Sequence, residues 1–344
     1  MLSALSTRLA FLSRYLYLAV AAVFIYVPLY RLDALRANLE VFGLTWRGAI
    51  RGAGWGVAAG LLTLGPYAVG YYAWHTVLGD RQAEFQWSNY LKWEQRATGR
   101  PDGAGEDPGV WLWADDHRVR LSIRAGETPV RLRLEADRPF RPDAEAAASA
   151  RPTDGGRADE RSAWRLDVPA GARGTVGVEP SGRGTSGYPT RLRVEALDGA
   201  SIRIGGAEAP AGSSATLRRT TRWIWMWLLT HLLVVALPEE FFYRGYLQTR
   251  IRQWLRARRC EEGGPADTRS RAGLSEENAL ASAAFALGHL AVPVGGVFAL
   301  QRASVFFPSL IFGVLRERTG TIAAPVVYHA CCNMMVLLLA VHLF

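Results

Sequence analysis

The stretch PEEFFYRG, residues 238–245, places two adjacent glutamates and an arginine at the end of a long apolar run. An ionised side chain inside a bilayer costs a few kcal/mol or more, so charges there need a partner or a task. Glu240 and Arg244 have i,i+4 spacing and can pair on one helix face, whereas Glu239 is turned about 100° away. The spacing predicts a structural pair and one glutamate that stays free for chemistry.

Two later apolar segments carry histidine and amide side chains at the same helical spacing. FALGH puts Phe285 and His289 on one helix face, and HACCN puts His329 and Asn333 on another. A helical bundle can aim these side chains and Glu239 at one interior point. A buried glutamate beside an imidazole can take a proton from water, and a second imidazole with an amide can stabilise an oxyanion. The set predicts a hydrolase.

Other functions use the same residue types and remain open at this point. Glutamate and histidine relays also serve proton channels and small transporters, although the helices show no inverted repeat or paired Gly/Pro breaks. A non-catalytic bacteriocin-immunity or membrane binding protein could keep the same polar residues for helix packing. Two histidines and a glutamate could also ligate zinc, although H-E-x-x-H spacing is absent.

The elements that position these groups are apolar segments of membrane-spanning length. Six are expected, at 9–30, 51–78, 222–241, 277–294, 297–315 and 321–343. A signal peptide is the alternative for the first, but that segment is longer than a usual h-region and lacks an A-x-A site. Pro238 is expected to break the third helix just before the carboxylates.

Arginine placement predicts the orientation of these six spans. Arginines concentrate in the short connections near 31–47, 244–275 and 316–318, which the positive-inside rule assigns to the cytoplasm. Residues 80–220 then lie outside the cytoplasm. The chain is accordingly divided into two N-terminal spans at 1–79, an insert at 80–220 and a four-helix membrane core at 221–344.

The insert shows the period-two alternation of half-buried strands separated by Gly, Pro and Asp turns. Strands are expected at 119–125, 130–136, 164–170, 190–196 and 201–206, which predicts a small all-β sandwich or barrel. The low-complexity stretch 141–163 is expected to be a mobile loop. No chemistry-bearing cluster stands out, so the insert is interpreted as a binding or spacer module.

Composition narrows the function classes further. The 344 residues carry a net charge of +9, but the arginines flank apolar runs and no nucleic-acid motif accompanies them, which argues against nucleic-acid binding. Three cysteines without C-x-x-C spacing support neither a disulfide framework nor a cysteine zinc site.

Taken in order, EEFFYR, FALGH and HACCN resemble the EExxxR, FxxxH and HxxxN motifs of the CPBP family. This family comprises CAAX-protease and bacteriocin-processing intramembrane proteases and includes the Rce1-type enzymes. The resemblance covers about 222–343, the family's four-helix catalytic core. It implies an intramembrane protease that cleaves a membrane-associated protein or peptide in the bilayer.

The resemblance also implies a role for each matching position. Glu239 would activate water with His289 as its partner, and His329 and Asn333 would form the oxyanion hole. Glu240 and Arg244 would be a supporting pair, with Phe285 in the F-x-x-x-H motif. The implied site is free of metal and cofactor. The Ala/Gly/Arg-rich composition favours a bacterial inner-membrane protein over the eukaryotic prenyl-protein enzymes.

Overall fold

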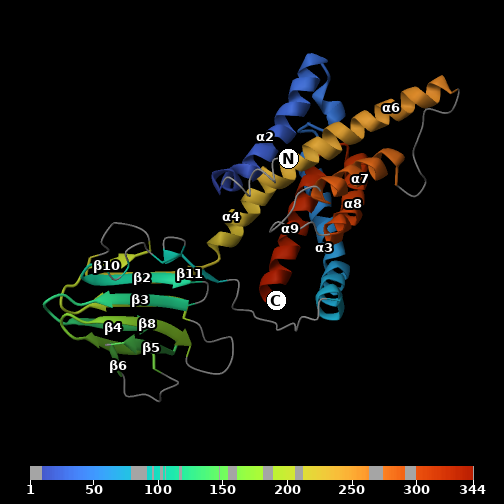
Figure 1. Cartoon of the computed structure of the whole chain (residues 1–344). Coiled ribbons are helices and arrows are strands. Elements are labelled where there is room, and N and C mark those ends of the chain that lie inside the picture. Colours follow the sequence, from blue (N-terminus) through green and yellow to red (C-terminus); the bar gives the residue numbers. More distant parts are fainter. Residues whose placement is uncertain are drawn as a thin grey trace. The chain divides into compact units, whose positions relative to one another are not determined.

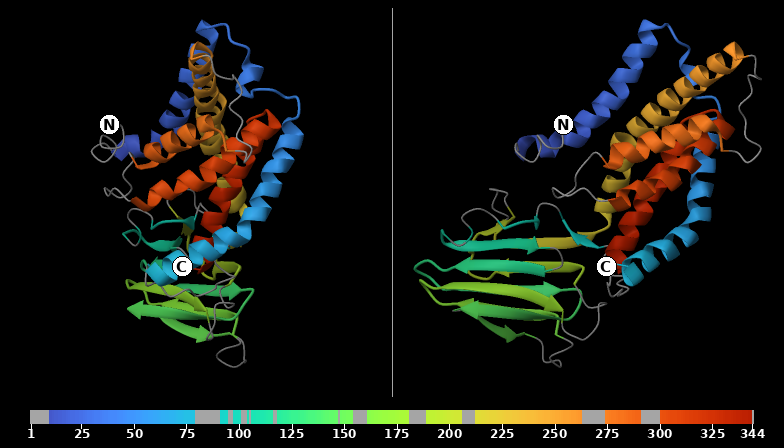
Figure 2. Two further views of the ribbon diagram at one scale, coloured as in Figure 1. Left: turned by 90° about the vertical axis from the view of Figure 1, so that its right-hand side faces the viewer. Right: turned by 45° about the vertical axis from the view of Figure 1, so that its right-hand side comes forward.

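A computed structural model describes residues 10–78, 91–94, 97–100, 104, 106–115, 118–146, 148–153, 161–180, 189–205, 212–262, 274–290 and 300–343. The chain divides into two compact units, one of Met1–Arg81 with Met226–Ala340 and one of Gln82–Trp225 with Val341–Phe344. The first unit is helical and the second is built from β-strands (Figures 1 and 2). Parts of the predicted segments, at 154–160, 263–273 and 291–299, lie outside the described residues.

The helical unit contains α2 (Ala10–Ala34), the short 3₁₀ turn η1 (Leu39–Phe42), α3 (Ala49–Ala73) and the π-helical η2 (Trp74–Leu78). A long helical run follows the insert, consisting of α4 (Arg222–Thr230), η6 (His231–Ala236), α5 (Leu237–Glu240), η7 (Phe241–Leu247) and α6 (Gln248–Glu261). The remaining elements are α7 (Glu276–Leu290), η8 (Leu300–Val305), α8 (Phe306–Thr319) and α9 (Ala323–Leu343).

The long run corrects two predictions. Pro238 does not break the helix, because it occupies the first turn of α5 directly after the π-helical η6. A wide π turn and a first-turn position together accommodate the missing N–H and the ring of proline. The arginine-rich stretch expected as a loop from residue 244 is helical to Glu261. Its Arg, Gln, Leu and Ala residues are good helix formers, which explains the continuation.

Two helical stretches are long and apolar enough to cross a membrane, Arg222–Glu261 and Ala323–Ala340. The other four predicted segments also contain helices, but their described residues do not meet the same criterion. Within those residues α7 has 15 residues and α8 has 14, which is short for a span. The count of six spans is therefore not confirmed.

Glycines on one face of α3 bring this helix against α9. A Cβ at Gly56 would lie 2.5 Å from the Ala324 carbonyl oxygen, and one at Gly60 would lie 3.0 Å from the Cβ of Cys331. Small residues four apart permit such close helix contact in membrane proteins. The Tyr328 hydroxyl adds a hydrogen bond to Thr63 at 3.1 Å. These contacts fix the axial position of α9, which carries two of the predicted site residues.

The β unit contains two sheets. One has the order β1-β11-β9-β4-β7-β6 and the other β10-β2-β3-β8-β5. Their strands are β1 (Lys92–Trp93), β2 (Gly109–Asp115), β3 (Arg118–Arg124), β4 (Val130–Ala136), β5 (Phe140–Ala146), β6 (Ser149–Pro152), β7 (Ala163–Val168), β8 (Arg173–Pro180), β9 (Arg191–Ala196), β10 (Ile202–Ile204) and β11 (Ser214–Thr220). Inward residues of both sheets form one apolar core, so the unit is a sandwich.

The five strands expected from alternation are confirmed as β3, β4, β7, β9 and β10. The mobile loop expected at 141–163 is wrong in its described part, since that part contains most of β5, all of β6 and the start of β7. Strand β5 pairs with β8 along its whole length, from Phe140 opposite Pro180 to Ala146 opposite Gly174. Pairing with a distant strand supplies the order that the local composition does not indicate.

Candidate active site

The Glu240–Arg244 pair is the centre of the polar cluster in the helical unit. Arg244 Nε lies 3.4 Å from Glu240 Oε2, and both side chains are fully buried. These two atoms form an ion pair but do not meet hydrogen-bond geometry. The guanidinium also lies 5.8 Å from the ring centres of both Phe285 and Phe312. The i,i+4 pairing predicted from spacing is confirmed.

His329 from α9 joins this pair to the second glutamate. Its Nδ1 lies 2.9 Å from Glu240 Oε1, and its Nε2 lies 4.0 Å from Glu239 Oε2. A carboxylate that is paired with an arginine accepts hydrogen bonds, so Nδ1 carries the proton in this contact. Nε2 is then the ring nitrogen that faces Glu239, and in the neutral ring it presents a lone pair there.

Glu239 differs from Glu240 in having no dedicated partner. Its Oε2 atom is buried and, among the described residues, accepts no hydrogen bond. His329 Nε2 lies 4.0 Å from this atom, which exceeds hydrogen-bond length but is a separation that one bridging water can span. The division into a paired and a free glutamate therefore holds in the structure.

His289 makes its described contacts with its own helix. No hydrogen bond or ion pair joins it to Glu239 among the described residues; instead its Nδ1 lies 3.0 Å from the Phe285 carbonyl oxygen of its own helix. This contact holds the ring against Phe285, with the centroids 4.4 Å apart. The imidazole in direct reach of Glu239 is that of His329, and a water held by Glu239 and His289 together stays a prediction.

The two predicted residues still to be placed, Phe285 and Asn333, both lie near His329. Phe285 approaches its ring edge-on at 5.9 Å. Asn333 lies one helical turn further along α9, is partly buried, and makes no hydrogen bond among the described residues. Phe312 was missed by sequence reasoning, yet it stacks on His329 at 4.9 Å with a 15° interplanar angle. Two phenyl rings and Glu240 thus hold the imidazole in place.

Residues 221–335 match the family described as "Type II CAAX prenyl endopeptidase Rce1-like". We refer to these residues as the Rce1-like domain, after the family that they resemble. The match covers about a third of the chain and agrees with the CPBP resemblance of the motifs. Rce1-like domains are integral membrane proteases that act on membrane-associated proteins. No curated protein and no solved structure matches the chain significantly.

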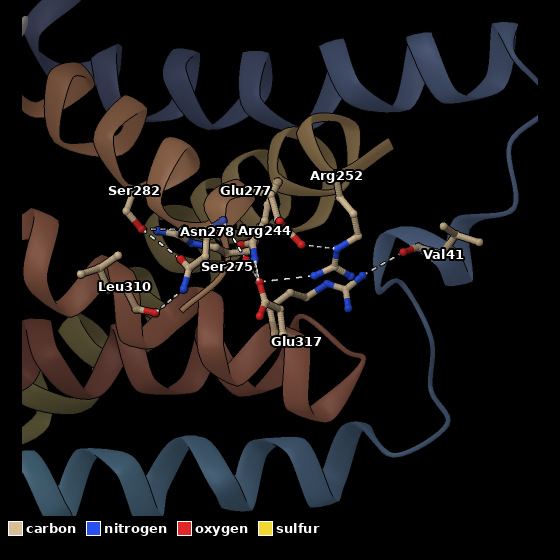
Figure 3. A network of polar contacts seen from close by, with 11 residues as sticks. Val41, Arg244, Arg252, Ser275, Glu277, Asn278, Ser282, Leu310 and Glu317 are labelled. Carbon is tan, nitrogen blue, oxygen red and sulfur yellow. Dashed lines mark hydrogen bonds and ion pairs between the residues drawn. The ribbon is translucent and has the colours of Figure 1, made fainter. Parts of the chain in front are cut away.

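A buried network inside the Rce1-like domain holds Arg244 (Figure 3). Arg244 donates to the hydroxyls of Ser282 at 3.2 Å and of Ser309, and Ser282 donates to Asn278 Oδ1 at 3.2 Å. Asn278 Nδ2 donates to the Leu310 carbonyl at 2.9 Å. The donated hydrogens run in one direction, from Arg244 through Ser282 to Asn278 and from Asn278 to the backbone of α8. The network fixes the position of η7 relative to α7 and α8.

The network residues were also missed by sequence reasoning, although one signal could have found them. Asn278 and Ser282 repeat the i,i+4 spacing of polar residues within an apolar helix, as the motif residues do. The position of Asn278 depends on Gly313, since a Cβ there would lie 1.8 Å from Asn278 Oδ1. A small residue in α8 therefore makes room for the amide.

A second set of ion pairs lies near the end of this network (Figure 3). Arg252 of α6 contacts Glu277 of α7 at 2.6 Å and Glu317 of α8 at 3.3 Å. Gln248 and Ser275 both donate to Glu317. These contacts tie three helices of the Rce1-like domain together. Among the described residues, no three His, Cys, Asp or Glu side chains are grouped as ligands for a metal ion.

Proposed function

We propose that the Rce1-like domain is an intramembrane endopeptidase in which Glu239 takes a proton from the attacking water. One observation carries the proposal: Glu239 Oε2 is buried, has no hydrogen-bond partner among the described residues, and faces His329 Nε2 at 4.0 Å. Two acceptors at that separation can share one water. The water then donates one hydrogen to each acceptor and directs a lone pair toward the substrate carbonyl.

The reaction proceeds in two steps with Glu239 as base and then acid. The water oxygen attacks the carbonyl carbon while its proton moves to Glu239, giving a tetrahedral intermediate with a negative oxygen. The Asn333 amide, one turn from His329, is the proposed donor to that oxygen. Glu239 then gives its proton to the leaving nitrogen as the C–N bond breaks, which restores the carboxylate.

The surrounding residues are proposed to position the imidazole. Glu240 fixes the tautomer of His329, and Arg244 balances the charge of Glu240 in the apolar interior. Phe285 and Phe312 hold the ring plane, and His289 packs behind Phe285. In this arrangement His329 is the imidazole that helps to hold the water.

We further propose the setting in which the reaction takes place. The substrate is a membrane-associated protein or peptide tail, and the protein resides in a bacterial inner membrane with residues 80–220 outside the cytoplasm. Residues 1–79 contribute two further spans to the core formed by 221–344. The arginine distribution of the connections supports this orientation.

A comparison of cleaved protein tails tests the proposal and identifies the substrate. Cells that produce the wild-type chain are compared with cells that produce Glu239→Gln at equal membrane abundance. Membrane-protein C termini that depend on the wild type are expected to disappear with the variant. The matched control is Glu262→Gln, because that exposed glutamate pairs only with Arg258 in α6. Identical tails with Glu239→Gln and wild type would favour a non-catalytic binding or immunity protein instead.

A further inference from the structure

Charge on the outer face of the larger sheet follows a repeated pattern. Three strands carry an arginine followed two residues later by an acid, and each arginine pairs with that acid. The pairs are Arg133–Glu135 at 2.6 Å, Arg165–Asp167 at 3.5 Å and Arg193–Glu195 at 3.6 Å. Residues i and i+2 share a face of a strand, so each of these three arginines is neutralised from its own strand.

Arg191 of β9 and Arg218 of β11 do not follow this pattern, and neither do Arg131 of β4 and Arg151 of β6 on the same face. Arg191 and Arg218 are directly opposite each other in the antiparallel register, and both are exposed. The Arg219 amide donates to the Thr190 carbonyl next to them, which makes Arg191 and Arg218 a non-hydrogen-bonded pair. Side chains of such pairs are the closest in a sheet, and like charges there repel. Among the described residues neither guanidinium has an ion pair.

Two adjoining hollows meet at these arginines. One has a volume of about 350 Å³ and the other about 470 Å³, and both are lined by Arg191 and Arg218. Each hollow also contains an acid that is already engaged. Glu135 pairs with Arg133, and Asp137 accepts the backbone amides of Thr190 and Arg191 at 2.8 Å each. The acids at the hollows thus serve the sheet, and the two guanidiniums remain available to an external anion.

The same face carries a further cation toward the start of α4. Lys92 of β1 is opposite Thr220, which shares a face with Arg218 two residues earlier. The Lys92 ammonium lies 4.5 Å from the ring centre of Trp223. Lys92, Arg218 and Arg191 therefore form an oblique row of positive charge across three strands.

The chain itself keeps this row close to a membrane-spanning helix. Arg218 precedes the candidate span Arg222–Glu261 by four residues, which is at most about 14 Å of extended chain. Tryptophans open that helix at 223, 225 and 227, and tryptophan is enriched at the level of lipid headgroups. The anionic groups found at the level of such a helix start are lipid phosphates.

We propose that Arg191 and Arg218, with Lys92 beside them, bind the headgroup phosphate of an anionic membrane lipid. The two guanidinium forks can each donate paired hydrogen bonds to phosphate oxygens, and the bound negative charge relieves their repulsion. The site precedes the Rce1-like residues 221–335 and requires no protease activity. The β unit would then have a function of its own, which is to bind a negatively charged lipid surface.

The test measures lipid binding to the full chain in dodecyl maltoside micelles by native mass spectrometry. Phosphatidylglycerol is the probe, and phosphatidylcholine and inorganic phosphate are the comparisons. Each basic residue near a membrane surface raises the affinity for anionic lipid about fivefold. Arg191→Gln/Arg218→Gln is therefore expected to weaken phosphatidylglycerol binding about ten- to thirtyfold. The control Arg118→Gln/Arg120→Gln removes equal charge from exposed positions of β3 in the other sheet and is expected to bind as wild type does.

Stability distinguishes a ligand site from a structural role. Without lipid, the Arg191→Gln/Arg218→Gln chain is expected to unfold at the same temperature as wild type or a higher one, because a repulsive pair has been removed. A lower unfolding temperature would assign the arginines to the fold and overturn the proposal. Equal loss of lipid in the control, displacement of lipid by inorganic phosphate, or preferential binding of a polyglutamate peptide would also overturn it.

Discussion

The helical unit and the β unit manage their charges in opposite ways. In the helical unit, Glu240 and Arg244 are fully buried, and the arginine is held by hydroxyls from two other helices. In the β unit, the charges are exposed, and three arginines of the larger sheet are balanced by an acid on their own strand. Glu239 in the first unit and the adjacent Arg191 and Arg218 in the second have no such partner among the described residues. We propose functions for these two groups, catalysis for Glu239 and lipid binding for Arg191 and Arg218.

The largest expected effect comes from breaking the buried pair. Arg244→Leu removes the counter-charge of buried Glu240 and leaves it only the His329 contact, which is expected to cost about 3–5 kcal/mol of stability. The matched control is Arg258→Leu in the same helical run, where Arg258 and Glu262 have the same spacing but are 61% and 62% exposed. That change is expected to cost about 0.5 kcal/mol or less. Thermal unfolding in micelles measures both, and equal losses would contradict the contrast between the units.

The next effect tests how α9 is held in place. Gly56→Ala puts a Cβ 2.5 Å from the Ala324 carbonyl oxygen, so α3 and α9 must move apart. Overpacking of this kind is expected to cost about 1–3 kcal/mol. Gly54→Ala is the control on the same helix, because a Cβ there meets nothing within 4 Å. It is expected to be neutral or stabilising by about 0.5–1 kcal/mol. The same unfolding assay should give opposite signs, and two equal losses would rule out the close contact.

The smallest effect concerns an acid of the β unit and depends on pH. Partial burial alone would raise the pKa of Asp137, but hydrogen bonds from Thr190 and Arg191 outweigh it and hold that pKa below its usual value. A lowered folded-state pKa stabilises the fold above the unfolded pKa of about 4, and this stability is lost as the pH falls through the folded value. Asp137→Asn is expected to cost about 0.5–1 kcal/mol at neutral pH and nothing in strong acid.

Near-ultraviolet circular dichroism of the tryptophan-rich β unit measures this difference in the full chain as a function of pH. Asp143→Asn is the control, since Asp143 lies exposed on β5 and makes no hydrogen bond or ion pair among the described residues. A pH-independent cost for Asp137→Asn would show that the carboxylate charge is not what stabilises the turn.

Local spacing predicted a good part of this structure. The Glu240–Arg244 pair follows from i,i+4 geometry, and β3, β4, β7, β9 and β10 follow from alternation of apolar and polar residues. Both the i,i+4 pair and the strand alternation depend only on residues within one helix or one strand, so the sequence is sufficient to predict them. Strand β5 was missed because its order comes from pairing with β8 rather than from its own composition, and β6 was missed because its polar sequence does not alternate.

The identity of the imidazole beside Glu239 could not be predicted in the same way. It depends on the rotation of α7 and α9 and on a backbone contact that holds His289 against Phe285. Spacing shows which residues of one helix share a face. It does not show how two helices meet, which here involves Phe312 stacked on His329 and Gly313 packed against Asn278. The same holds for Pro238. A proline alone predicts a helix break, but the π turn before it lets the helix continue.

The most direct measurement of the central claim is cleavage of an identified substrate tail in ¹⁸O-labelled water by the purified chain in lipid nanodiscs. The account predicts one ¹⁸O atom in the new C-terminal carboxylate and a loss of about 10²–10⁴ in rate for Glu239→Gln with unchanged folding. The exposed control Glu262→Gln should cleave at the wild-type rate. Wild-type rates from Glu239→Gln would contradict the assignment of Glu239 as the base.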